Sequence, residues 1–235
     1  MSESRSDPSA RDSLGRVAAE VAACRACPRL VEWRESVATE KVARFRDWDY
    51  WARGVPGFGD PDAHLVVVGL APAAHGANRT GRVFTGDRSG DFLYAALHRS
   101  GYANQPTSVS VDDGLRLRGA WITAAVRCAP PANKPMPSER DTCRPFLQRE
   151  LALLGKARVL LALGQFGWDV VCSTYGLRPR PRFGHGAEAD VGGVTLLGCF
   201  HPSQQNTFTG KLTPAMIDAV LARAQAASAR STSPA

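Results

Sequence analysis

The chain has 235 residues, of which 44% are hydrophobic and 22% are charged, a balance that excludes global disorder and suits one domain with its own core. The formal net charge of +7 indicates a polyanionic partner such as nucleic acid, although a basic protein without such a partner would carry the same charge. There is no apolar run of the roughly 18 residues that a membrane span needs, and no apolar signal-peptide core follows the N-terminus, so we expect a cytoplasmic protein without membrane contact.

Strands alternate with helices through the middle of the chain. The hydrophobic periodicity predicts, in order, a helix at 14–23, a strand at 64–69, a helix at 90–100, a strand at 120–126, a helix from 138 with a Ser-x-x-Asp cap, a strand at 158–163, a helix at 165–175, a strand at 194–200 and a helix opening at Thr213-Pro214. We therefore expect an α/β fold with three α/β/α layers and a central, mostly parallel four-stranded sheet.

The two ends of the chain lack this periodicity. Residues 1–13 and 226–235 are rich in Ser, Ala, Arg and Pro, which predicts disordered tails around one domain at 14–225. We expect this domain to be a monomer. Parallel sheets bind ligands outside the carboxyl ends of their strands, so the loops at 69–87 and 201–211 are the candidates for chemistry.

Four of the six cysteines have the spacing of metal ligands. Cys24 and Cys27 form a C-x2-C pair, and Cys128 and Cys143 form a wider pair. Disulfides are rare in the reducing cytoplasm, so these thiolates predict either a [4Fe–4S] cluster or a structural zinc. Cys172 and Cys199 have apolar neighbours and are interpreted as buried hydrophobic residues.

Four features in one order resemble the uracil-DNA glycosylase superfamily, specifically family 5, the type-B enzymes. They are Gly69-Leu-Ala-Pro-Ala73, Arg79-Thr-Gly-Arg-Val-Phe-Thr-Gly-Asp87, the four cysteines, and His201-Pro-Ser-Gln-Gln-Asn206. Together they span nearly the whole chain. The resemblance implies a uracil-DNA glycosylase-like fold with a [4Fe–4S] cluster on Cys24, Cys27, Cys128 and Cys143. It also implies hydrolysis of the N-glycosidic bond of uracil, hypoxanthine and other modified bases in DNA, the first step of base excision repair.

The same resemblance assigns roles to individual residues. Phe84 would stack on the flipped base, and His201 would donate a hydrogen bond to the uracil O2 as the base leaves. Short polar side chains around Phe208 in the last loop suit contacts to lesion-containing double-stranded DNA, or to single-stranded DNA, with Phe208 as a wedge, although an ordinary polar turn would have the same composition; they are Gln204, Gln205, Asn206 and Thr209. Several cations flank these loops and could hold phosphates, namely Arg79, Arg82, Arg127, Lys134 and Arg180.

The chain departs from related families at two polar positions of the base pocket. Leu70 and Ala71 replace an acidic or amide side chain, and Ala124 replaces an asparagine. With Ala73 and Phe84 these residues would line an apolar pocket that accepts a broader set of bases. The attacking water must then be held by Asn78, by Asp87 or by backbone carbonyls near Ala73, although Asp87 could equally serve as a helix cap.

Two other classes of function are compatible with parts of the pattern. A non-catalytic nucleic-acid-binding protein with a structural zinc would explain the charge and the cysteines, but it leaves His201 and Phe84 without roles. A redox protein would explain the cluster, but no dinucleotide motif accompanies it. No lysine lies in the catalytic motifs to form a Schiff base, and Lys211 sits among the DNA contacts, so a glycosylase here would be monofunctional.

Overall fold

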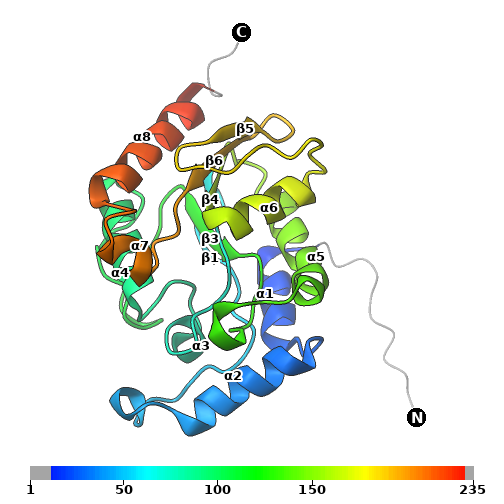
Figure 1. Ribbon diagram of the computed structural model, residues 1–235, viewed down its shortest axis with the longest axis vertical. Helices are drawn as coiled ribbons and strands as arrows, with labels where there is room; N and C mark the ends of the chain where they lie inside the picture. Colours follow the sequence, from blue (N-terminus) through cyan, green and yellow to red (C-terminus); the bar gives the residue numbers. More distant parts are fainter. Residues whose placement is uncertain (1–11, 231–235) are drawn as a thin grey trace, which may run out of the picture.

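The computed structural model describes residues 12–230 and contains one six-stranded sheet between two layers of helices (Figure 1). The strand order is β1-β3-β2-β4-β6-β5. The four central strands are parallel, and they are β2 (Leu65–Gly69), β3 (Ala120–Ala124), β4 (Val159–Leu163) and β6 (Thr195–Cys199). The mostly parallel sheet expected from the sequence is therefore present.

The expected number of four strands is wrong, because a short antiparallel strand extends each edge of the sheet. These strands are β1 (Phe58–Gly59), which pairs with β3, and β5 (Glu188–Asp190), which pairs with β6. They are 2 and 3 residues long, so neither could show the alternation that reveals a longer strand. Backbone pairing with a neighbour, which leaves no sequence pattern, creates both strands.

Eight α-helices and two short 3-10 turns surround the sheet within residues 12–230. The helices are α1 (Leu14–Ala23), α2 (Pro28–Glu40), α3 (Ala77–Thr80), α4 (Arg88–Arg99), α5 (Pro137–Leu153), α6 (Gly164–Thr174), α7 (Gln204–Phe208) and α8 (Pro214–Arg230). The turns are η1 (Ala43–Phe45) and η2 (Pro131–Asn133). No helix in this part of the chain is long and apolar enough to cross a membrane.

Two expected element ends are corrected. Helix α8 continues to Arg230, so a disordered tail from 226 is wrong for 226–230, where the buried Ala227 extends the apolar face of the helix. A disordered tail is also wrong for residues 12 and 13, because Asp12 forms an ion pair with Arg149 and Ser13 caps α1 by accepting from the amide of Arg16. The remaining tail residues, 1–11 and 231–235, lie outside the described residues. Helix α5 begins at Pro137 rather than with a Ser138 cap, and Glu139 accepts a 2.7 Å hydrogen bond from the amide of Met136.

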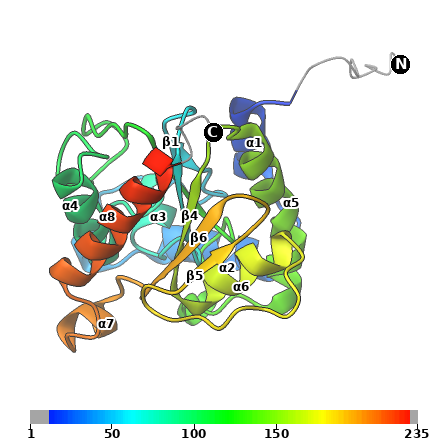
Figure 2. The same cartoon turned by 90° about the horizontal axis from the view of Figure 1, so that it is seen from above.

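Side chains alternate along the buried strands and so build two apolar layers. In β2, Leu65 and Val67 pack in the cluster formed with α4 and α8, whereas Val66 and Val68 pack with α5 and α6. Figure 2 shows α4 and α8 on one side of the sheet and α5 and α6 on the other. This three-layer arrangement leaves the carboxyl edge of the parallel strands free, and the loops that follow β2, β3 and β6 meet there.

Candidate functional site

A cavity of about 510 Å³ opens at the carboxyl edge of the parallel strands. This is within the range of about 300–1,000 Å³ usual for small-molecule sites. Loops after β2, β3 and β6 line it with Leu70, Ala71, Pro72, Ala73, Val83, Phe84, Asp87, Arg88, Ser89, Ala124, Asn133, His201, Ser203, Gln204 and Gln205. The structure thus brings together all five residues expected to contact a base, with His201 and Asp87 beside them.

Phe84 and His201 are aromatic neighbours within this cavity. Their ring centroids lie 6.0 Å apart with an interplanar angle of 36°. The Phe84 ring also lies against Gly69, where an added Cβ would be 2.8 Å from the ring carbon Cε2. Glycine is therefore required at the end of β2, because any side chain there would displace the phenyl ring from the cavity wall.

His201 presents a neutral imidazole to the cavity. Burial lowers the pKa of its ring to about 4, because the low-dielectric surroundings disfavour the charged form. Near neutral pH the ring therefore carries one N–H that can donate to a ligand. The main chain of His201 is held in turn by Asn206, whose Nδ2 donates to the His201 carbonyl oxygen at 2.8 Å.

Asp87 caps a helix and faces the cavity at once. Its Oδ1 accepts a 2.9 Å hydrogen bond from the amide of Gly90 in the first turn of α4, as a helix N-cap does. Burial raises the pKa of this carboxyl above its ordinary value, and the amides of Ser89 and Gly90 only partly oppose that effect. A half-buried carboxylate on the cavity wall is a group that can hold a water molecule.

The structure places Asn78 and Arg79 away from the cavity lining, contrary to expectation. Asn78 is fully buried in α3, and its Nδ2 donates to the carbonyl oxygen of Arg34 at 3.1 Å. The Arg79 guanidinium stacks 3.9 Å from the centroid of Phe45 and 4.1 Å from that of Trp48. Arg79 is 3% exposed, so it cannot reach a phosphate in this arrangement.

Of the four other cations expected near DNA, two are buried and two are exposed. Arg82 and Arg127 are buried and form ion pairs of 2.7 Å with Asp113 and Glu150 respectively. Arg180 pairs with an aspartate of α6 at 3.2 Å. Lys134 is exposed and directly follows Asn133, which lines the cavity, but Lys134 itself is not among the lining residues.

Helix α7 forms the outer rim of the cavity. Gln204 and Gln205 are exposed there, and Thr209 Oγ1 donates to the Gln205 carbonyl oxygen at 2.7 Å. Phe208 is 68% exposed, with the guanidinium of Arg88 5.2 Å from its ring centroid. An exposed phenyl ring beside a cation is suited to a surface that meets stacked bases and phosphates.

Several lining residues were missed by the sequence analysis. Arg88 and Ser89 directly follow Asp87, and Asn133 lies in the loop after β3. A systematic reading of the loop after each parallel strand would have included Asn133, because β3 ends at the same edge as β2. Pro72, Val83 and Ser203 complete the lining beside residues that were expected.

The four cysteines expected to hold a metal line one small cavity. Cys24 and Cys27 lie between α1 and α2, Cys128 follows β3, and Cys143 is in α5. Burial raises the pKa of the Cys143 thiol to about 12. Cys172 and Cys199 are buried in the two main core clusters, as expected. Within residues 12–230, no group of three or more His, Cys, Asp or Glu side chains is arranged to hold a single metal ion.

Polar hydrogens point at two of these sulfur atoms. Arg34 is 1% exposed, and its Nη1 donates to Cys128 Sγ at 2.9 Å while its Nη2 donates to the Cys24 carbonyl oxygen at 3.1 Å. Its Nε has no partner among the described residues. The backbone amide of Arg127 donates to Cys143 Sγ at 3.3 Å. The Arg34 guanidinium therefore places a buried positive charge directly beside Cys128.

Comparison with known proteins gives a consistent family. Residues 56–225 match the uracil DNA glycosylase superfamily. A type-5 uracil-DNA glycosylase of Mycobacterium tuberculosis is 56% identical over 217 residues, covering 91% of this chain and 81% of the relative. A type-5 uracil-DNA glycosylase of Thermus thermophilus is 53% identical over 205 residues, covering 86% of this chain and 93% of the relative. A type-4 uracil-DNA glycosylase of Pyrobaculum aerophilum is 32% identical over 130 residues, covering 55% of this chain and 58% of the relative.

Proposed function

The chain belongs to the uracil DNA glycosylase superfamily, and from this we propose that it hydrolyses the N-glycosidic bond of uracil in DNA as the first step of base repair. One observation carries the proposal: Phe84, Asp87 and His201 line a single cavity at the carboxyl edge of the sheet. A base inside a duplex is out of reach of such a cavity, so the nucleotide must flip out of the stack. Phe84 then covers one face of the base.

His201 stabilises the departing base. As the bond to C1′ of the sugar breaks, negative charge grows on the base and is shared by the uracil O2. A neutral imidazole that donates one N–H to this oxygen lowers the barrier, as oxyanion-hole donors do. The low pKa of His201 keeps the ring neutral, so it supplies a hydrogen bond without transferring a full proton.

Asp87 is our candidate for holding the attacking water. Its carboxylate lines the cavity, whereas the Asn78 amide is bonded to Arg34 outside it. The water attacks C1′, where positive charge develops, and a nearby carboxylate both orients the water and stabilises that charge. The products are the free base and an abasic site, and no strand cleavage is expected because no lysine lines the cavity.

We further propose that hypoxanthine and other deaminated bases are substrates. Leu70, Ala71 and Ala124 give the cavity an apolar wall, and such a wall has few buried polar groups that a different base would leave unpaired. Discrimination between base edges should therefore be weak.

The rim residues indicate how DNA is held. Gln204, Gln205 and Arg88 would contact the strand beside the flipped nucleotide, and Phe208 would fill the gap left in the stack. Such a wedge suits double-stranded DNA, in which the flipped nucleotide leaves a gap in the base stack. Single-stranded DNA would also be a substrate, but its release of uracil would not need the wedge. We propose that the protein acts as a monomer in the cytosol, where the DNA is.

We also propose that Cys24, Cys27, Cys128 and Cys143 hold a [4Fe–4S] cluster. Two features support the fit: the buried Arg34 guanidinium at Cys128, and the Arg127 amide directed at Cys143. Such donors are typical partners of cluster thiolates. The cluster would supply a covalent cross-link between α2, the end of β3 and α5. Ala71 packs against the small core cluster of Leu30, Val126 and Cys128 and also lines the cavity, so this cross-link would brace the cavity wall.

The test uses duplexes with one labelled strand that carries a single uracil or a single hypoxanthine. We expect cleavage at the lesion only after alkali treatment, and the ratio of the two rates measures the breadth of the cavity. Cleavage without alkali would contradict a monofunctional mechanism. Intact strands from folded, metal-loaded protein would favour a non-catalytic DNA-binding role.

A further inference from the structure

Phe84 occupies its place in the cavity with a backbone conformation that few residues adopt. Its φ angle of 52° lies in the left-handed region, which glycine enters freely and bulky side chains rarely do. The ring is at the same time confined between His201 and Gly69. A non-glycine residue keeps such a conformation only where its surroundings determine it. The neighbours of Phe84 must therefore hold it in place.

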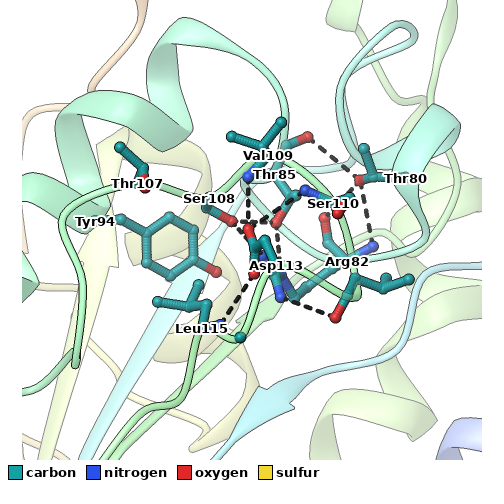
Figure 3. Close-up of polar contacts among 12 residues, drawn as sticks. Thr80, Arg82, Thr85, Tyr94, Thr107, Ser108, Val109, Ser110, Asp113 and Leu115 are labelled. Carbon is teal, nitrogen blue, oxygen red and sulfur yellow. Dashed lines mark hydrogen bonds and ion pairs between the residues drawn. The ribbon is translucent and has the colours of Figure 1, made fainter.

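A buried polar network holds the residues on both sides of Phe84 (Figure 3). The Arg82 guanidinium donates to Thr85 Oγ1 at 3.0 Å and to Ser108 Oγ at 2.8 Å. The hydroxyls of Thr85 and Ser108 lie 2.7 Å apart and share a hydrogen bond. Since Arg82 precedes Phe84 by two positions and Thr85 follows it, these bonds close a polar ring across the strained residue.

Asp113 is the anion of this network. Its Oδ2 accepts from Arg82 Nη2 at 2.7 Å and from the amide of Val109 at 2.7 Å, and its Oδ1 accepts from the amide of Leu115 at 3.0 Å. Burial opposes ionisation of Asp113, but the Arg82 hydrogen bond and the backbone amides outweigh it and lower its pKa to about 2. The Asp113 carboxylate thus stays charged. It fixes Arg82 through the ion pair and fixes its own loop through the amides of Val109 and Leu115.

Two further bonds complete the support of the segment from Arg82 to Gly86. Tyr94 of α4 donates its hydroxyl to the Val83 carbonyl oxygen at 3.0 Å. The amide of Gly86 donates to the Ser108 carbonyl oxygen at 2.9 Å. Asp113 itself is not among the residues that line the cavity, so any effect it has on a bound base must pass through this segment.

We propose that Asp113 is a positioning residue for base binding, which fixes the ring of Phe84 against the flipped base through Arg82 and Thr85. This inference rests on the proposed function of the cavity, because Phe84 is taken to stack on the base. It gives the loop around Asp113, which lies outside the recognised motifs, a part in the reaction.

A double-mutant cycle tests the inference. Single-turnover rates of uracil release are measured for the native protein, Asp113→Asn, Phe84→Ala and the double variant. We expect Asp113→Asn to slow release about 10- to 100-fold by misplacing the ring. In the Phe84→Ala background the same change should have no further effect, because the ring through which Asp113 acts is gone. Affinity for undamaged duplex should not change.

Controls separate positioning from folding. Asp218→Asn removes a carboxylate from the exposed Arg99–Asp218 ion pair and should leave the rate unaltered. If Asp113→Asn does not fold, Ser108→Ala removes one hydroxyl of the network and enters the same cycle. Equal slowing of the native and Phe84→Ala proteins by either change would overturn the inference, as would a native rate for Asp113→Asn. An inactive native protein would instead refute the proposed function.

Discussion

The Nδ2 atom of Asn206 donates a 2.8 Å hydrogen bond to the carbonyl oxygen of His201. Asn206 was expected to contact DNA, but this bond directs its amide inward and ties the first turn of α7 to His201, the residue that we propose faces the leaving base. One side chain therefore joins the cavity rim, which we propose meets DNA, to His201, whose imidazole we propose stabilises the base. Movement of α7 on DNA would be transmitted to His201.

Replacing His201 and Asn206 should affect chemistry rather than DNA binding. His201→Ala removes the donor to the base and should cost about 10–1000-fold in the single-turnover rate. Asn206→Ala should slow the same step about tenfold and add nothing in the His201→Ala background, because both act on one group. A native rate for Asn206→Ala together with weakened DNA binding would return Asn206 to the role of a direct DNA contact.

Asp87→Asn separates helix capping from water activation. Asparagine caps helices about as well as aspartate, so the thermal midpoint should change little. The amide cannot act as a base, and we expect the chemical rate to fall about 100-fold. Burial raises the pKa of Asp87, so the native rate should decline as the pH falls through that raised value and the carboxylate is protonated.

The pH profile of the variant is the sharper measurement. In Asp87→Asn the part of the acid decline caused by Asp87 should be absent, since the titrating group has been removed. A variant that keeps both the native rate and the native acid limb would show that another group holds the water.

Phe208 should matter only where a stack must be opened. Phe208→Ala is expected to slow uracil release from a duplex about tenfold, because the gap left by the flipped nucleotide is no longer filled. Release from single-stranded DNA should be unaffected. Phe208→Leu keeps an apolar wedge and serves as the matched control. Equal slowing on both substrates would argue that Phe208 supports the fold of α7 instead.

Removal of a cysteine ligand should remove iron. Native protein purified without chelator should contain about four iron atoms per chain and be coloured. Cys128→Ala or Cys143→Ala should lose both and melt at a lower temperature. Cys172→Ala, which removes a buried thiol from a different core cluster, should keep them. One zinc atom per chain and no colour would contradict the cluster.

The parallel core of the fold was predictable because each central strand is a short apolar run between helical patterns. Helix α2 was not predicted, and Arg34 shows why. Arg34 lies on the same buried helical stripe as Leu30 and Val37, at spacings of four and three residues. A charged residue in that stripe breaks the apolar period. Its burial beside Cys128 depends on a partner that no periodicity reveals.

The candidate site was predictable where strand ends carry its residues, as for Leu70, Ala124 and His201. It was not predictable where a side chain's direction decides its role. The sequence places Asn78 and Asp87 in one loop, but only the fold shows that the first turns toward Arg34 and the second toward the cavity. Arg79 was likewise assigned to DNA from its charge, although aromatic rings enclose it.

The central claim is that the cavity bounded by Phe84, Asp87 and His201 receives the damaged base. A crystal structure of the His201→Ala variant, slowed enough to retain its substrate, in complex with a uracil-containing duplex would test it most directly. We expect a uracil lying on the Phe84 ring, with its O2 toward position 201 and a water between Asp87 and C1′. A uracil that remains stacked in the duplex, or that binds outside this cavity, would contradict the account.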